Sequence, residues 1–382
     1  MSVIEILTWK CSPRHQQQIV ISQYIEGEFM AASDIEIREK VPLAPLTTLG
    51  VGGSAKFFVR ARSVPEVEQA VKFASSRSLE LFVLGGGSNL VVSDRGFNSL
   101  VVQVAIDGIK ESRREGQAFF DCGAGVNWDE FVAFSIACGC GGVECLSGIP
   151  GSVGGTPVQN VGAYGQDVSE TIVSVLAYDL KENRVCQLGK AECGFEYRSS
   201  IFNSNERRRY VILLVTFELR NGAEPALRYA DLQKRFAGRP AKPSLAEVRD
   251  AVLEIRAGKG MLISPGDPDS HSAGSFFKNP VLGVEEFSLL SQKAAARGTQ
   301  VPSYPALSQR SKVSAAWLVE NSGFHKGYQK GAVAISNKHA LAIVNRGGAT
   351  AAEVIALRDE IQSKVATTWG VSLDTEPVFV GF

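Results

Sequence analysis

The chain has 382 residues, which is long enough for more than one domain with a core of its own. Apolar residues make up 45% and charged residues 21%, as in an ordinary globular protein, and forty basic residues balance forty acidic ones. Binding to a nucleic-acid backbone needs a basic field, so this balance argues against a nucleic-acid partner.

Residues 1–40 are polar and weakly periodic, and we expect them to form a poorly ordered N-terminal extension. The beginning of this segment has no apolar stretch long enough for a signal peptide. No run of about 18 apolar residues occurs anywhere in the chain, so a membrane span is not expected. These features favour a cytoplasmic protein.

Residues 42–221 show alternating helix and strand patterns and are expected to form the first domain. One helix is predicted behind Ser63, which opens a capping box with Glu66. A second helix is predicted behind the cap residue Asn127 and ends near Cys138. Strands are predicted at 81–84, 90–93, 99–105, 118–122, 171–179 and 210–219.

The second domain is expected to cover residues 222–382. The segment 221–243 contains Pro225, Pro240 and Pro243 and little periodicity, which is typical of a domain junction. Ser244 then opens another capping box and a helix. Further helices are predicted at 283–297, 313–321 and 350–368, and strands at 340–345 and 378–382, which together indicate a small mixed α/β domain.

The seven cysteines give no sign of a disulfide framework or a metal site. Their number is odd, which favours reduced thiols in the cytoplasm. Cys138, Cys140 and Cys145 cluster, but their spacing fits no common zinc signature, and the chain has four histidines. We therefore expect small buried thiols and no bound metal.

Two glycine-rich stretches stand out. Residues 85–89, Gly-Gly-Gly-Ser-Asn, lie between two predicted strands, so they lack the following helix of a dinucleotide fingerprint. They can form an anion-binding nest of backbone N–H groups, or a hairpin turn that binds nothing. Residues 147–165 form an unusually long loop whose apolar residues argue against disorder. Two such loops in one domain predict a large cofactor between them.

Four motifs together resemble the UDP-N-acetylenolpyruvoylglucosamine reductases: LGGGSN, LSGIPGSVGGTPVQNVGAYG, YRSSIF and AGSFFKNP. The resemblance covers roughly residues 42–382. It implies an α/β (α+β) chain with an FAD-binding domain of the PCMH or vanillyl-alcohol oxidase type, made of two α+β subdomains. A C-terminal α/β substrate-binding domain follows.

The resemblance also implies noncovalently bound FAD, NADPH as hydride donor, and UDP-N-acetylglucosamine enolpyruvate as the substrate that becomes UDP-N-acetylmuramate. A cytoplasmic enzyme of peptidoglycan synthesis is therefore expected. The loop 227–232 is similar to the substrate-covering tyrosine loop of the type I members, and the implied contacts to substrate or NADPH are Tyr229, Lys259, Asn279 and Asn321. The implied FAD-binding residues are Gly85, Gly86, Gly87, Ser88, Asn89, Gly151, Ser152, Gly154, Gly155, Gln159, Asn160, Gly162, Ala163 and Tyr164.

The chemistry explains which catalytic residues such an enzyme needs. The carbon of an enol ether accepts a hydride only if the adjacent carboxylate can hold the electron density as an enolate. The resemblance assigns that stabilisation to Arg198 and Glu376, and the donation of a proton to the other carbon to Ser275. Asp374 is an alternative to Glu376, because the local sequence Leu-Asp-Thr-Glu-Pro departs from the family pattern.

Two alternative interpretations, a flavin oxidase of the same fold and a homologue without catalytic activity, predict other sequence features. Flavin oxidases of the same fold often tether FAD through a histidine, and no histidine lies between His15 and His271. A homologue that binds a nucleotide sugar without turnover would be expected to lack Arg198, Ser275 or Glu376, and all three are present.

Overall fold

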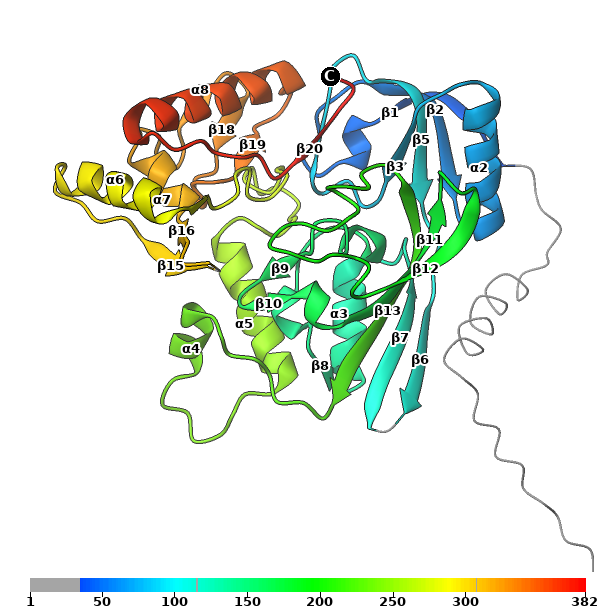
Figure 1. Cartoon of the computed structure of the whole chain (residues 1–382), viewed down its shortest axis with the longest axis horizontal. Helices are drawn as coiled ribbons and strands as arrows, with labels where there is room; N and C mark the ends of the chain where they lie inside the picture. The colour runs from blue at the N-terminus through cyan, green and yellow to red at the C-terminus, as the bar shows by residue number, and fades with distance from the viewer. Residues whose placement is uncertain (1–34, 115, 307) are drawn as a thin grey trace, which may run out of the picture.

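The computed structural model describes residues 35–114, 116–306 and 308–382 (Figure 1). The expected N-terminal extension, residues 1–40, lies outside the described residues as far as residue 34. Its last residues belong to the fold, because strand β1 covers Arg38–Pro42 and pairs antiparallel with β2, Ser54–Ala61. The predicted extension therefore reaches too far into the chain. Strand β1 is a mostly exposed edge strand, so no apolar alternation marks it in the sequence.

The first sheet has four strands in the order β1-β2-β5-β3, in which β5 covers Phe97–Val104 and β3 covers Leu81–Leu84. Both β2 and β3 run parallel to β5. Helix α2, Val64–Ser76, packs on this sheet, and its N-cap Ser63 accepts the predicted hydrogen bond from the Glu66 N–H. The reciprocal bond differs, since the Glu66 carboxylate accepts from the N–H of the residue before Ser63.

The second sheet is antiparallel, with strands in the order β12-β11-β13-β7-β6, and the short strand β8 also pairs with β13. Helix α3, Trp128–Ala137, is capped by Asn127 as predicted, and its Phe131 stacks on Phe217 of β13 at a centroid distance of 4.7 Å. The edge strands β6 and β12 are not predicted from the sequence, because β6 is largely polar and β12 is short, with three apolar residues in no regular alternation. The strands cover Ile109–Arg114 (β6), Gln117–Gly123 (β7), Cys140–Gly141 (β8), Ile172–Asp179 (β11), Arg184–Gly189 (β12) and Tyr210–Asn221 (β13).

The long glycine-rich loop after α3 contains only short elements. The 3-10 helix η3 lies in its middle, and strands β9 and β10 pair with each other near its end. The short elements in this part of the chain and before β2 cover Ala44–Leu46 (η1), Glu144–Leu146 (η2), Val153–Gly155 (η3), Gly162–Ala163 (β9), Gln166–Asp167 (β10) and Val168–Glu170 (η4).

The remaining residues form helices and two small three-stranded sheets, which confirms the mixed helix and strand class (Figure 1). Helix α5, Leu245–Gly258, begins with the predicted capping box between Ser244 and Glu247. Helix α4, Ala230–Phe236, lies in the segment predicted to be a junction. The other elements cover Val281–Leu282 (β14), Val284–Ala295 (α6), Ser303–Pro305 (β15), Ser311–Val313 (β16), Ala315–Glu320 (α7), Gln329–Lys330 (β17), Val333–Ile335 (β18), Ile343–Asn345 (β19) and Ala351–Trp369 (α8).

The last strand crosses back to the N-terminal part of the chain (Figure 1). Strand β20, Val378–Val380, pairs in parallel with β4, Leu90–Val92, rather than with a strand of the C-terminal part. Strands β3 and β4 therefore belong to different sheets, and residues 85–89 are not a hairpin turn. The glycine-rich stretch joins two sheets, and its Gly87 and Asn89 carbonyls accept hydrogen bonds from the N–H groups of Thr48 and Val378.

A half-buried ion pair joins α5 to α3. Both terminal guanidinium nitrogens of Arg249, Nη1 and Nη2, donate to the Asp129 carboxylate, at 2.6 and 2.8 Å, and the Gly148 N–H donates to the same carboxylate at 2.6 Å. Burial acts to raise the pKa of Asp129, but these hydrogen bonds outweigh it and hold the pKa below its usual value. The contact links both helices to the long glycine-rich loop.

We expect Asp129→Asn to lower the free energy of unfolding by about 2 kcal/mol at pH 7, because the variant leaves Arg249 without a charged partner. The folded-state pKa is depressed, so this stabilisation is fully present above the unfolded pKa of about 3.9 and is lost as the pH falls below it. Urea denaturation of both proteins at pH 7 and pH 3 checks the sign. A difference that grows on acidification would contradict the assignment.

Candidate active site

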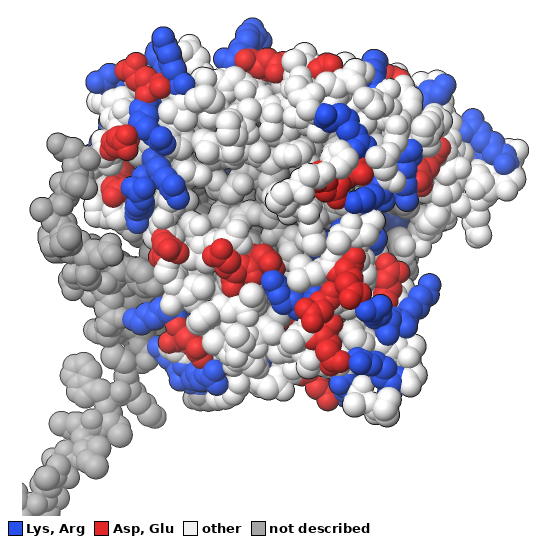
Figure 2. Space-filling view, turned by 180° about the vertical axis from the view of Figure 1, so that it is seen from behind, with Lys and Arg blue, Asp and Glu red and all other residues white. Residues whose placement is uncertain are grey.

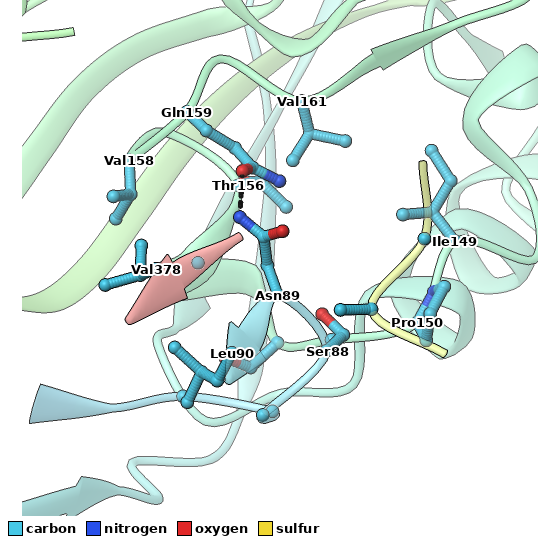
Figure 3. Close-up of a pocket in the computed structure, with 18 of the residues that line it drawn as sticks. Ser88, Asn89, Leu90, Ile149, Pro150, Thr156, Val158, Gln159, Val161 and Val378 are labelled. Atoms are coloured by element: carbon cyan, nitrogen blue, oxygen red, sulfur yellow. Dashed lines mark hydrogen bonds between the residues drawn. The ribbon is translucent and has the colours of Figure 1, made fainter. Parts of the chain in front are cut away.

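A cavity of about 550 Å³ lies where the first sheet, the two glycine-rich stretches and the C-terminal part meet. Figure 3 shows part of its wall, with residues 88–90, segments of the long loop and Val378 facing one another. Outside the cavity, acidic and basic side chains are interspersed on the face in Figure 2. The cavity is therefore the concave site to test for a cofactor.

The two glycine-rich stretches meet backbone to backbone. A Cβ added at Gly86 would lie 2.6 Å from the Cα of Gly151. Asn89 joins the same wall, because its side-chain amide donates to Gln159 Oε1 at 2.5 Å (Figure 3) and to the Glu376 backbone oxygen at 3.2 Å. The loops and strand β20 thus form one continuous surface of backbone and amide groups.

Two orphaned polar atoms on this wall indicate an anionic or strongly polar ligand. Ser152 Oγ and Arg256 Nε are buried, and neither has a hydrogen-bond partner among the described residues. Both residues line the cavity. Buried polar groups are nearly always satisfied, so a bound group is expected to supply the missing partners. Glycine backbone, an orphaned hydroxyl and a cavity of about 550 Å³ fit a dinucleotide cofactor such as FAD.

Arg198 and Glu376 form an ion pair in the cavity wall. Arg198 Nε lies 3.1 Å from Glu376 Oε1, and their side chains are only 19% and 16% exposed. The Arg198 guanidinium also donates to the backbone oxygen of Gly162 at 2.5 Å, which fixes its plane. Burial raises the pKa of Glu376, although Arg198 and Lys278 act in the opposite direction. Arg198 and Glu376 are distant in sequence but adjacent in the structure. Such proximity is required if both are to stabilise the same enolate.

Ser275 lines the same cavity, beside Gly274, which has a φ of +75°. The next residue, Phe276, is fully buried; its N–H donates to the Leu341 oxygen at 2.8 Å, and its own carbonyl accepts from the Glu376 N–H at 2.9 Å. Asp374, the alternative to Glu376, is exposed and does not line the cavity. The geometry therefore favours Glu376 over Asp374.

Cationic and aromatic side chains lie together in another part of the wall. The rings of Tyr164 and Tyr229 meet edge to face at 5.1 Å, and Lys259 Nζ lies 5.5 and 5.4 Å from their centroids. Lys259 also lies 3.5 Å from the Asp231 carboxylate. The buried Arg256 lines the cavity too. This combination suits a phosphorylated ligand with a flat base.

Three of the predicted site residues do not line the cavity. Asn160 is buried and bonds to the backbone of Glu196 and Ser169. Asn279 accepts a hydrogen bond from the Ala315 N–H at the start of α7, and Asn321, which follows α7, donates to the Trp317 carbonyl of that helix. The structure brings all the other predicted site residues together around the cavity.

The wall also contains residues that the sequence analysis does not name, among them Arg207, Arg208 and His339. The run of three arginines at 207–209 is a signal that points to the first two. No local pattern marks His339, which stands in an ordinary Asn-Lys-His-Ala sequence. Such residues are recognised only once the fold places them.

The described part of the chain shows no group of three or more His, Cys, Asp or Glu side chains arranged to hold a metal ion. The cysteines in the described ranges are unpaired, and burial raises the pKa of Cys145 to about 12, which keeps this thiol inert. None of the described helices is long and apolar enough to cross a membrane.

Known proteins resemble the chain over most of its length. A model for an FAD binding domain matches residues 55–185, and a model for the C-terminal domain of UDP-N-acetylenolpyruvoylglucosamine reductase matches residues 267–380. The reductase of that name from Thermobifida fusca is 48% identical over 347 residues, which cover 89% of this chain and 97% of that protein. The chain belongs to the UDP-N-acetylenolpyruvoylglucosamine reductase family.

Other members support the same conclusion. The reductase from Corynebacterium glutamicum strain R is 40% identical and covers 95% of this chain and 99% of its own. The crystal structure of the reductase from Thermus caldophilus matches 91% of this chain with a TM-score of 0.62 at 24% identity, which confirms the fold. Membership of this reductase family confirms the expected flavoenzyme class, and the match at residues 55–185 confirms an FAD-binding domain.

The structure distinguishes two kinds of glycine in the FAD-binding wall. A Cβ at Gly86 or Gly154 would clash at 2.6 Å with residues 151 and 124, so these glycines are needed for packing of the protein itself. A Cβ at Gly155 would meet Ser152 Oγ only at 3.9 Å, and Gly155 lines the cavity. A side chain at Gly155 therefore meets no close protein atom and has room at the cavity wall.

We expect Gly155→Val to weaken FAD binding by roughly 10- to 100-fold, the equivalent of about 1–3 kcal/mol of overpacking, while the flavin-free protein keeps its melting temperature. Gly86→Val should lower both the affinity for FAD and the melting temperature of the flavin-free protein. Flavin titration by fluorescence and thermal unfolding of the flavin-free variants measure the two effects. Full flavin affinity in Gly155→Val would show that the cofactor does not lie against this residue.

Proposed function

We propose that the chain reduces UDP-N-acetylglucosamine enolpyruvate to UDP-N-acetylmuramate with NADPH, as a cytoplasmic enzyme of peptidoglycan precursor synthesis. The observation that carries this proposal is the convergence of Arg198, Glu376 and Ser275 on the cavity that the glycine-rich stretches line. Reduction of the carbon–carbon double bond of an enolpyruvyl group needs an acid, a cation and a hydroxyl at one place, because the adjacent carboxylate must hold the developing charge.

FAD, when bound, supplies the redox chemistry by accepting a hydride from NADPH and delivering it to the methylene carbon of the enolpyruvyl group. Arg198 stabilises the negative charge that develops on the substrate carboxylate, because its permanently charged plane is already fixed by Gly162 and Glu376. Burial raises the pKa of Glu376, so a proton is easier to place on this carboxyl than on an exposed one, and the protonated form can donate a hydrogen bond to the same substrate carboxylate.

Ser275 gives its hydroxyl proton to the carbon next to the carboxylate, and the proton is restored from solvent after the product leaves. The backbone around Ser275 is held on both sides of Phe276, which keeps the hydroxyl in place. Lys259 and Tyr229 are assigned to the phosphorylated part of the substrate or NADPH, together with Arg256. Asn279 and Asn321 stay proposed contacts that would require α7 to approach the ligand.

The test uses purified full-length protein. A flavin absorption band, release of free FAD on denaturation, and oxidation of NADPH that depends on the enolpyruvyl substrate are expected. Mass spectrometry should show a product two hydrogens heavier than the substrate. Protein that binds no flavin, or that oxidises NADPH at the same rate without the substrate, would overturn the proposed function.

A further inference from the structure

His339 lies in the loop between β18 and β19 and lines the cavity. Its ring nitrogen Nδ1 lies 3.0 Å from the backbone N–H of Leu341. A backbone N–H can only donate, so Nδ1 is the acceptor and the neutral ring carries its proton on Nε2. The hydrogen bond therefore requires one protonation state of the ring.

The surroundings of His339 favour that state. Burial lowers the pKa of His339 to about 4, and the nearby cations Lys259, Lys326 and Arg256 act in the same direction. The ring is therefore neutral at the pH of a cell, and Nδ1 stays an acceptor.

The backbone on the N-terminal side of the ring is fixed by other contacts. The buried Ser336 hydroxyl accepts from the N–H groups of Lys338 and His339, at 3.0 and 3.2 Å. The buried Asp269 carboxylate accepts from the Asn337 N–H at 3.0 Å and pairs with Arg346 at 2.8 Å. These hydrogen bonds fix the backbone that carries the His339 ring, and the ring in turn accepts from the Leu341 N–H.

Leu341 connects this support to the two catalytic segments. Its carbonyl accepts from the Phe276 N–H at 2.8 Å, and the Phe276 carbonyl accepts from the Glu376 N–H at 2.9 Å. Phe276 follows Ser275 directly in the chain. A series of hydrogen bonds therefore runs from the His339 ring through Leu341 to the backbone of Ser275 and Glu376.

We propose that His339 is a positioning residue for the reduction, whose neutral ring holds Leu341 and thereby sets the positions of Ser275 and Glu376 in the cavity. The inference rests on the proposed function. A general acid loses much of its effect when it is displaced by about 1 Å, so loss of the Nδ1 acceptor is expected to affect proton donation in particular.

Three variants separate the two ring nitrogens. In His339→Asn, Oδ1 can take the place of Nδ1 and accept from Leu341. In His339→Gln, a polar group reaches the position of Nε2 but the acceptor near the backbone is lost. His339→Ala removes both groups, so it serves in place of the Gln variant if that protein does not fold.

The measurement is stopped-flow absorbance of the flavin band, first with NADPH and then with the enolpyruvyl substrate, after flavin content and melting temperature have been recorded. We expect His339→Gln and His339→Ala to slow reoxidation by substrate roughly 10- to 100-fold while flavin reduction by NADPH is much less affected. His339→Asn should restore most of the reoxidation rate.

Other outcomes overturn the inference. A normal Gln variant beside a slow Asn variant would mean that the ring acts through Nε2, on a ligand. Equal slowing of both half-reactions in all variants would mean that the ring only fills space. If the wild-type flavin is reduced by NADPH but not reoxidised by the substrate, the proposed function itself is wrong.

Discussion

Ser275→Ala is expected to leave reduction of the flavin by NADPH close to the wild-type rate and to slow its reoxidation by the enolpyruvyl substrate by roughly 10²–10⁴-fold. The reason is that only the second half of the reaction needs a proton on carbon. The substitution removes a hydroxyl but no charge, so the electrostatics of the Arg198 and Glu376 pair stay as they are. Stopped-flow absorbance measures each half separately.

Ser372→Ala is a matched control, because Ser372 is exposed and lies outside the cavity wall. It should change neither half-reaction. If Ser275→Ala slows flavin reduction as much as reoxidation, Ser275 is structural and the proton comes from another group. Unchanged reoxidation would remove the serine from the mechanism altogether.

Arg198→Ala is expected to slow reoxidation by roughly 10²–10³-fold and also to weaken substrate binding, since its charge meets the substrate carboxylate before and during the reaction. The variant leaves the buried Glu376 without its cation, so the pKa of Glu376 should rise further and the acid should become neutral. Half-reaction rates at several substrate concentrations separate the loss of binding from the loss of rate.

The coupling of the pair can be measured with the variants Arg198→Ala, Glu376→Gln and both together. Because the two side chains act on one carboxylate, the double variant should lose less than the sum of the single losses. Arg235→Ala, which breaks an exposed ion pair with Glu254, is the control and should change neither rate. Additive losses would show that Arg198 and Glu376 act independently.

The sequence predicts the elements that carry strong local signals. Ser63, Asn127 and Ser244 cap the helices that they are expected to cap, because N-cap chemistry is local. The central strands β5, β7, β11 and β13 are also predicted from their apolar runs. Strand β2 is missed although it is central and mostly buried, because Lys56 and Arg60 interrupt its apolar pattern. Strands β6 and β12 are missed because edge strands with one exposed side carry little apolar signal.

The site follows a different logic. Motifs predict Arg198, Ser275 and Glu376, and the structure places all three at one cavity. Asn160 resembles a cofactor ligand in sequence, but its side-chain amide donates to the Glu196 carbonyl and accepts from the Ser169 N–H. His339 reaches the cavity only through the packing of a loop between β18 and β19. Local patterns therefore identify the proposed catalytic residues better than the residues that support them.

The pairing of β20 with β4 also bears on when the growing chain can bind FAD, the group that would colour the protein. The ribosome makes residues 85–92 early, but β4 has its partner strand only once residues 378–380 exist. The same late segment supplies Glu376 and Val378 to the cavity wall. A chain that stops before residue 376 would contain the whole matched FAD-binding region, 55–185, and is nevertheless expected to be colourless. We therefore expect flavin to bind only after translation of the segment that closes the cavity.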